Sequence, residues 1–285
     1  MTMDLAAIQA LRFDDVQQHY AARDSILYAL GLGYGDDPLD ERQLRYVYED
    51  GLRTVPSMCS TLCQPGFWAR DPRFGIDWVK VLHAEQAFEL MTLIPPAGSM
   101  HADIRIAGLE DKGADKGAMV HQIKELRLAD GSPVARVRTT LFLRGNGGEG
   151  GFGATVEPAI ALPDREPDRR VSIPTSPRSA LIYRLSGDWN PLHADPAIAR
   201  KAGFERPISH GLGTLGVATR AVLTAYCDDE PARLKALFVR FSRPVFPGET
   251  IQIDFFEEPD GVRFRAMSKE RNIVVLDRCH ARIGA

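Results

Sequence analysis

Three polar residues whose chemistry suits proton transfer lie within one short, proline-containing segment. The string "SGDWNPLHAD" (Ser186 to Asp195) holds a carboxylate at Asp188, an amide at Asn190 and an imidazole at His193. An imidazole can take a proton from water near neutral pH, and a nearby carboxylate can share or relay the proton that moves to carbon. Asn190 can orient water or a neighbour, or simply form an Asx turn. The segment therefore contains the groups needed for general acid–base catalysis.

A short predicted helix fixes the position of this segment. Asp195 is suited to be its N-cap and Pro196 to be its first residue, and "AIARKAG" continues it until Gly203. Asp188 and His193 therefore lie just ahead of a helix start, on a stiffened stretch of chain. Rigid placement suits groups that must meet a reacting atom in a fixed geometry.

A second, longer helix is predicted from Gly211 to Cys227, directly after His210. Its apolar residues recur at helical spacing, and its first turns contain Gly211, Gly213 and Gly216, which allow a sheet or a ligand to approach closely. The backbone N–H groups at a helix start are free of intrahelical partners. The Gly211 amide is therefore a candidate donor to a developing oxyanion.

The chain divides into two halves with similar patterns. A glycine-rich stretch and a charged, proline-broken stretch predict a linker over residues 145–170, between domains at 1–144 and 171–285. Each half ends in a predicted antiparallel meander that starts at a Pro-Gly turn, which suggests a duplication. In the second half, the long helix would be embraced by the sheet. In the first half, the corresponding helix is expected to be shortened or broken at Pro56.

The composition excludes several classes of protein. The 285 residues carry a formal net charge of −3 with both signs interspersed, which argues against nucleic acid as a partner. No apolar run approaches the ~18 residues of a membrane span. Four scattered cysteines do not make a disulfide framework, so reduced thiols are predicted. These features predict a soluble cytoplasmic protein with no nucleic-acid or membrane partner.

The segment "YRLSGDWNPLHADP" (Tyr183 to Pro196) resembles the signature of the R-specific 2-enoyl-CoA hydratases, the hydratase 2 or MaoC-like dehydratase family. The segments "DWVKVLHAEQAFEL", "RPISHGLGTLG" and "VRFSRPVFPGET" extend the resemblance over nearly the whole chain. It implies an α+β double hot-dog fold of the two-domain type, in which two antiparallel sheets each wrap around a helix.

The resemblance also implies roles for the residues of the motif. Asp188 and His193 become the catalytic pair, Asn190 their supporting polar group, and the backbone N–H of Gly211 the oxyanion donor. The first half has no matching string. It is therefore expected to be non-catalytic and to accommodate the acyl chain, with one active site per chain.

Four further residues are weaker candidates for substrate binding. His83 resembles a family position, with a structural role or a place at the edge of the acyl-CoA site. His210 is expected to orient the helix start and not to transfer the proton. Arg240 and Arg243 are suited to the phosphates of coenzyme A, or are ordinary charges at a strand edge.

The expected reaction is the reversible hydration of trans-2-enoyl-CoA to (3R)-3-hydroxyacyl-CoA. It needs no metal or other cofactor, because coenzyme A belongs to the substrate, and a homodimer is the expected assembly. The alternatives are a 3-hydroxyacyl-ACP or hydroxy-dicarboxylyl-CoA dehydratase, an acyl-CoA thioesterase and a non-catalytic acyl-CoA-binding protein. A metal hydrolase is also conceivable, although its ligands would match no established spacing: Asp188, His193, Asp195 and His210.

The size of the acyl group depends on the first half. A broken helix there would leave volume beside the sheet, lined by Val55, Met58 and Leu62, which favours medium or long acyl chains. The competing expectation is that Trp68 and Phe74 fill this space and leave a short-chain enzyme.

Overall fold

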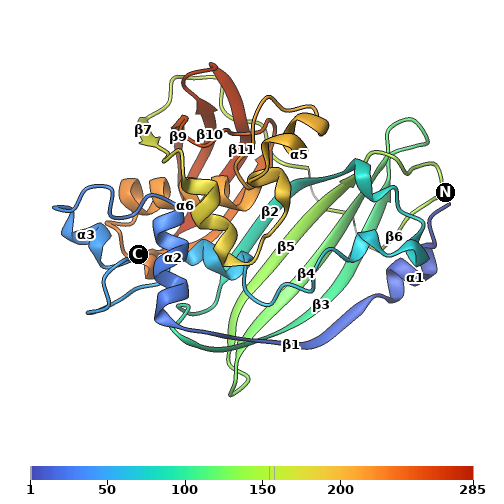
Figure 1. Cartoon of the computed structure of the whole chain (residues 1–285), viewed down its shortest axis with the longest axis horizontal. Helices are drawn as coiled ribbons and strands as arrows, with labels where there is room; N and C mark the ends of the chain where they lie inside the picture. Colours follow the sequence, from blue (N-terminus) through green and yellow to red (C-terminus); the bar gives the residue numbers. More distant parts are fainter. Residues whose placement is uncertain (1, 154, 157, 285) are drawn as a thin grey trace.

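The computed structural model describes residues 2–153, 155–156 and 158–284. Its centre is an antiparallel sheet in the order β1-β3-β4-β5-β2-β8-β11-β10-β9-β7, with β6 paired to β3 (Figure 1). The strands of the first half and the short strand that follows them are β1 (Arg12–Tyr20), β2 (Val81–Leu90), β3 (Gly98–Asp111), β4 (Ala118–Leu128), β5 (Pro133–Leu143) and β6 (Phe152–Gly153). Those of the second half are β7 (Arg169–Pro174), β8 (Leu234–Phe241), β9 (Thr250–Glu258), β10 (Gly261–Ser268) and β11 (Ile273–Ile283).

The strand order has the symmetry expected of a duplicated chain. Read outward from the β2–β8 junction, β5, β4, β3 and β1 on one side correspond to β11, β10, β9 and β7 on the other. The predicted meanders of both halves are therefore confirmed, and the α+β double hot-dog architecture with them. The two half-sheets also join into one continuous sheet, since β2 pairs with β8 and Glu85 lies opposite Arg240.

Most helices lie on one side of this sheet. The α-helices are α1 (Leu5–Ala10), α2 (Ala22–Gly31), α3 (Glu41–Leu44), α4 (Ser179–Tyr183), α5 (Pro196–Lys201) and α6 (Gly211–Tyr226). The 3-10 helices are η1 (Pro56–Ser60), η2 (Trp68–Arg70), η3 (Pro72–Phe74), η4 (Trp78–Lys80), η5 (Arg184–Ser186), η6 (Pro191–His193) and η7 (Pro231–Arg233). The predicted helix starts at Pro196 and Gly211 are both confirmed.

The long helix α6 is the centre of the second half, and it packs tightly against the first. Ten consecutive residues, Thr214 to Leu223, are buried. A Cβ at Gly216 would lie 2.3 Å from a methyl carbon of Leu32, which follows α2. Gly216 is therefore needed because the two halves approach each other at this point.

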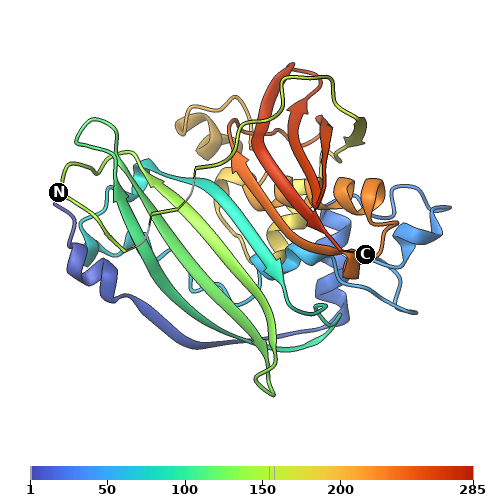
Figure 2. The same ribbon diagram turned by 180° about the vertical axis from the view of Figure 1, so that it is seen from behind.

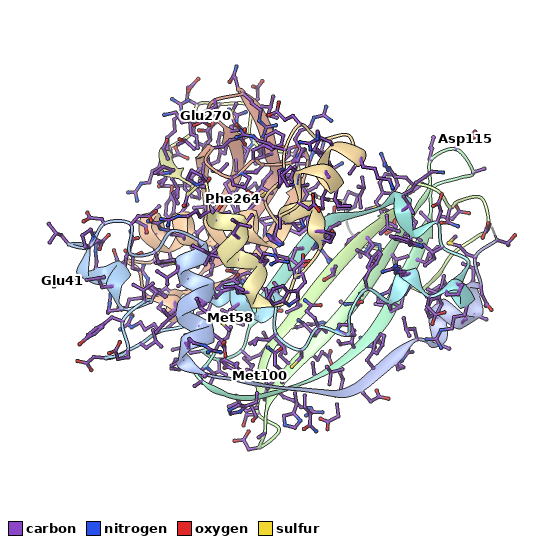
Figure 3. The ribbon with its side chains drawn as sticks, in the orientation of Figure 1. Glu41, Met58, Met100, Asp115, Phe264 and Glu270 are labelled. Atoms are coloured by element: carbon purple, nitrogen blue, oxygen red, sulfur yellow. The ribbon has the colours of Figure 1, made fainter. Side chains whose placement is uncertain are left out.

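The first half has no equivalent of α6 in the segment that the sequence predicts to be broken. The five-residue helix η1 stands there, and Pro56 begins it. Met58 of η1 and Met100 of β3, both labelled in Figure 3, belong to the same hydrophobic core as α6. Trp68 and Phe74 lie in a second core cluster, with their rings edge to face.

The connection between the halves runs past the strands of the second half (Figure 2). Its glycine-rich start is fixed by Asp111, whose carboxylate accepts hydrogen bonds from the N–H groups of Gly148 and Gly150. Residues 154 and 157 of the predicted linker lie outside the described residues, as do residues 1 and 285 at the ends of the predicted domains. All four cysteines are buried and free. No helix in the described part of the chain is long and apolar enough to cross a membrane.

Candidate active site

The segment between η5 and α5 brings the three predicted polar residues together. The Asn190 N–H donates to Asp188 Oδ1 at 3.1 Å, and Asn190 Oδ1 accepts from the Leu192 N–H at 3.0 Å. Asn190 therefore caps η6 through an Asx turn, one of its two expected roles. Asp195 caps α5 by accepting from the N–H of Ala197. These bonds hold Asp188 and the helix that carries His193 in a fixed relation.

His193 is oriented as a proton acceptor. Its Nδ1 lies 2.9 Å from the Ile208 carbonyl oxygen, so Nδ1 carries the hydrogen and Nε2 a free lone pair. Nε2 lies 4.0 Å from Asp188 Oδ2, and the Asp188 side chain is 53% exposed. Burial lowers the pKa of His193. The imidazole is therefore neutral near pH 7, as a base must be.

His210 contacts both Asp188 and His193. Its Nε2 lies 3.2 Å from the backbone oxygen of Asp188, and its ring centroid is 3.8 Å from that of His193. Burial, followed by repulsion from His193, lowers the pKa of His210 to about 4. His210 therefore stays neutral and holds the Asp188 backbone. The sequence predicted that it orients the helix start; the structure adds its contacts with Asp188 and His193.

The start of α6 lies against residues from both halves. The Gly211 N–H opens the helix and has no acceptor within it. A Cβ at Gly211 would meet the Phe241 ring at 3.4 Å, and the Phe241 ring centroid is 4.8 Å from that of His83. Gln86, through its side-chain oxygen, fixes His83 Nε2 at 2.9 Å. The β2–β8 junction thus brings His83 to the site.

Phe241 is a site residue that the sequence analysis did not select. The signal was present, because Val239 is buried and Phe241 shares its face of β8. Phe241 lies between two charged residues in sequence, Arg240 and Arg243, so its segment has the composition of an exposed strand end. In the structure all three line one open groove of about 650 Å³, together with Arg265 and Asp277. Through Phe241 the groove reaches the start of α6.

The charges of the groove are positive on balance. Arg265 is paired with Asp254 at 3.0 Å. Arg240 and Arg243 are exposed, and neither takes part in a salt bridge among the described residues. Two exposed guanidinium groups beside the site are suited to bind phosphate.

A small cavity of about 20 Å³ lies between α6, α4 and the end of α2, and His210 is one of its lining residues. It has room for about one or two water molecules. Val55, Met58 and Leu62 do not line it; they are at most 3% exposed and pack in the core.

The site also contains a group of potential metal ligands. One ligand atom from each of Asp188, His193 and His210 lies within 4.8 Å of the other two. Asp195, the fourth residue of the metal-hydrolase alternative, is not part of this group and caps α5 instead.

Family models and a solved structure define the class of protein to which this chain belongs. Residues 18–145 match the family model of the MFE-2 hydratase 2 N-terminal domain, and residues 159–277 match that of the MaoC-like domain. A crystal structure of a MaoC-like dehydratase from Phytophthora capsici is 33% identical, with a TM-score of 0.87 and 99% of both chains covered.

Curated relatives narrow this class. A peroxisomal enoyl-CoA hydratase 2 of Arabidopsis thaliana is 36% identical over 94% of this chain and 91% of its own length. A 3-hydroxyacyl-thioester dehydratase Y of Mycobacterium tuberculosis is 39% identical over 85% of this chain and 84% of its own. The chain belongs to the enoyl-CoA hydratase 2 family of MaoC-like hydro-lyases.

Proposed function

We propose that this protein adds water reversibly to trans-2-enoyl-CoA and gives (3R)-3-hydroxyacyl-CoA. The observation that carries the proposal is the position of His193, whose Nδ1 is bonded to the Ile208 carbonyl oxygen and whose Nε2 lies 4.0 Å from Asp188 Oδ2. Family membership gives the reaction class, and the geometry supports the roles proposed for these residues.

The reaction then follows from the positions of these groups. Asp188 and His193 hold a water molecule over carbon 3 of the substrate and take one of its protons as the hydroxyl adds. The electron pair of the double bond moves toward the thioester oxygen, and the Gly211 N–H stabilises that developing enolate. A proton returned to carbon 2 completes the addition. Asp188 and His193 act as one coupled acid–base unit in this proposal, which uses no metal or redox cofactor.

The test is a panel of enoyl-CoA thioesters of increasing length, followed by the loss of conjugated absorbance and by chiral analysis of the product. A (3S) product or no hydration of any member would refute the proposal. Release of free thiol without hydration would favour the thioesterase alternative, since a thioesterase cleaves the bond that a hydratase leaves intact.

We further propose that the open groove lined by Arg240 and Arg243 binds the phosphates of coenzyme A. Its support is the exposure of Arg240 and Arg243 beside Phe241, whose ring lies 3.4 Å from where a Cβ at Gly211 would be. Arg240→Gln together with Arg243→Gln should raise KM for enoyl-CoA at least tenfold with kcat kept, as expected for lost charge-assisted hydrogen bonds.

The matched control for this groove is a truncated enoyl thioester of N-acetylcysteamine, which carries no phosphate. Its kcat/KM should be the same for the double variant and the parent protein. An equal loss with both substrates would show that the arginines act on the site itself and not on the carrier. Preference for enoyl-ACP over enoyl-CoA would favour the carrier-protein alternative.

The acyl tail is proposed to enter the first half. Its support is the difference in helix length, five residues in η1 against 16 in α6. The closed packing of Val55, Met58 and Leu62 means that the tail must displace or rearrange these side chains.

We also propose a homodimer and a cytoplasmic location. Support for the dimer comes from Trp78, Val79 and Leu82, which are 42%, 73% and 45% exposed in η4 and at the start of β2. Light scattering should give twice the chain mass, and Val79→Glu should shift it toward one chain. Cell fractionation tests the location, because the Arabidopsis relative is a peroxisomal enzyme.

A further inference from the structure

Three neighbouring polar side chains, Asp188, His193 and His210, are of the residue types that make up a transition-metal ligand set. One ligand atom from each of Asp188, His193 and His210 lies within 4.8 Å of the others. Two imidazoles and a carboxylate bind zinc, and three protein ligands leave a fourth tetrahedral position for water. We propose that this site binds one Zn²⁺ ion, or Co²⁺ in its place, and that the ion inhibits hydration.

Both imidazoles are held in the way that metal-ligating histidines are. His193 Nδ1 lies 2.9 Å from the Ile208 carbonyl oxygen, and His210 Nε2 lies 3.2 Å from the Asp188 carbonyl oxygen. Each ring therefore donates one N–H to the backbone and keeps a lone pair on its other nitrogen. This backbone support is what orients histidines around bound metals.

The free nitrogen of His210 is an independent observation. Its Nδ1 is fully buried and has no hydrogen-bond partner among the described residues, on a side chain that is 2% exposed. A buried acceptor without a partner is unfavourable, and a cation would satisfy it. The His193 ring lies beside it, with 3.8 Å between centroids and 32° between planes. Because the two rings lie this close to parallel, the His210 ring has to turn before its free nitrogen and that of His193 can contact one ion.

Asp188 completes the set and gives access to it. Its Oδ2 lies 4.0 Å from His193 Nε2, whereas two ligands of one zinc ion are roughly 3.3 Å apart. The side chain is 53% exposed, so it is free to close this gap. The same exposure opens the site to ions from solvent.

Inhibition follows because the ion would occupy the lone pairs that accept the proton from water. This part of the inference rests on the proposed function, whereas metal binding by itself does not. The two are therefore measured separately.

Binding is tested on tag-free full-length protein. Titration with Co²⁺ should develop the visible absorption of a four-coordinate ion, and equilibrium dialysis should find one Zn²⁺ per chain. His193→Gln and His210→Gln should each weaken binding at least tenfold. His101→Gln is the control, since His101 pairs with Asp15 at 2.7 Å on the first-half sheet and should leave binding unchanged.

Inhibition is tested with crotonyl-CoA. Zn²⁺ should lower the rate of hydration, and a chelator should restore it. The inference is overturned by no stoichiometric uptake at roughly 0.1 mM metal, by an equal loss of binding in His101→Gln, or by uptake that leaves the rate unchanged or raises it. Lack of hydration by the metal-free protein, with zinc still bound by the site, would count against the proposed function alone.

Discussion

Replacing Asp188 with asparagine changes the charge of the site and little else. Asn has nearly the same size, and its Oδ1 can still accept the hydrogen bond from the Asn190 N–H. The side chain is 53% exposed, so no buried contact is lost. We therefore expect the free energy of unfolding to change by less than about 0.5 kcal/mol.

The expected effect on turnover is much larger. Removal of one partner in general acid–base catalysis lowers kcat by roughly 10²–10⁴. This corresponds to about 2.7–5.4 kcal/mol in the activation barrier. Because the carboxylate is lost only as a proton-transfer group, KM should change far less than kcat.

The assay is hydration of crotonyl-CoA, with thermal unfolding of each variant measured in parallel. Asp195→Asn is the matched control, since it is the same substitution on the same segment and asparagine still caps α5. It should keep kcat within about twofold. Asp188→Asn with turnover within tenfold of the parent, or an equal loss in Asp195→Asn, would refute the assignment.

Four further outcomes are expected. His193→Gln should lower kcat as much as Asp188→Asn, and the double variant little more, because the two act as a unit. Prolonged dialysis against a chelator should leave hydration intact; loss restored by zinc would instead favour the metal hydrolase. Burial lowers the pKa of His193, and it lowers that of His210 to about 4. As the pH falls, these two histidines are therefore protonated in the unfolded chain before they are protonated in the folded chain. Denaturant midpoints should therefore fall as pH drops from about 6.5. Gly216→Ala should lower the melting temperature through its clash with Leu32, whereas Gly213→Ala, with 3.6 Å of clearance, should not.

Chain-length preference tests the role of the first half. A tail buried there gains up to about 0.8 kcal/mol per methylene, so kcat/KM should be clearly higher for a C10 than for a C4 enoyl-CoA. A preference for C4 would rule out the proposed tail site in the first half, but it would not count against the proposed hydration reaction.

The sequence by itself determined the secondary-structure elements and was enough to select the candidate reacting groups. Alternating residues after Pro-Gly turns predicted the meanders, and Asp195-Pro196 and Gly211 marked two helix starts that the structure confirms. These features are local: strand alternation, capping and glycine placement act over a few residues. The spacing of Asp188 and His193 is local too, which is why the pair could be selected from one short string.

Tertiary structure alone decided what surrounds that pair. The His83 and Phe241 rings meet because β2 pairs with β8. The His210 ring lies beside that of His193 because α6 starts next to the segment that carries His193. Lys124 is a further case, since its position in β4 does not reveal that it is buried and donates to the Ser60 carbonyl at 3.2 Å. Such contacts join residues far apart in the chain, and local periodicity carries no information on which distant partner a face will meet.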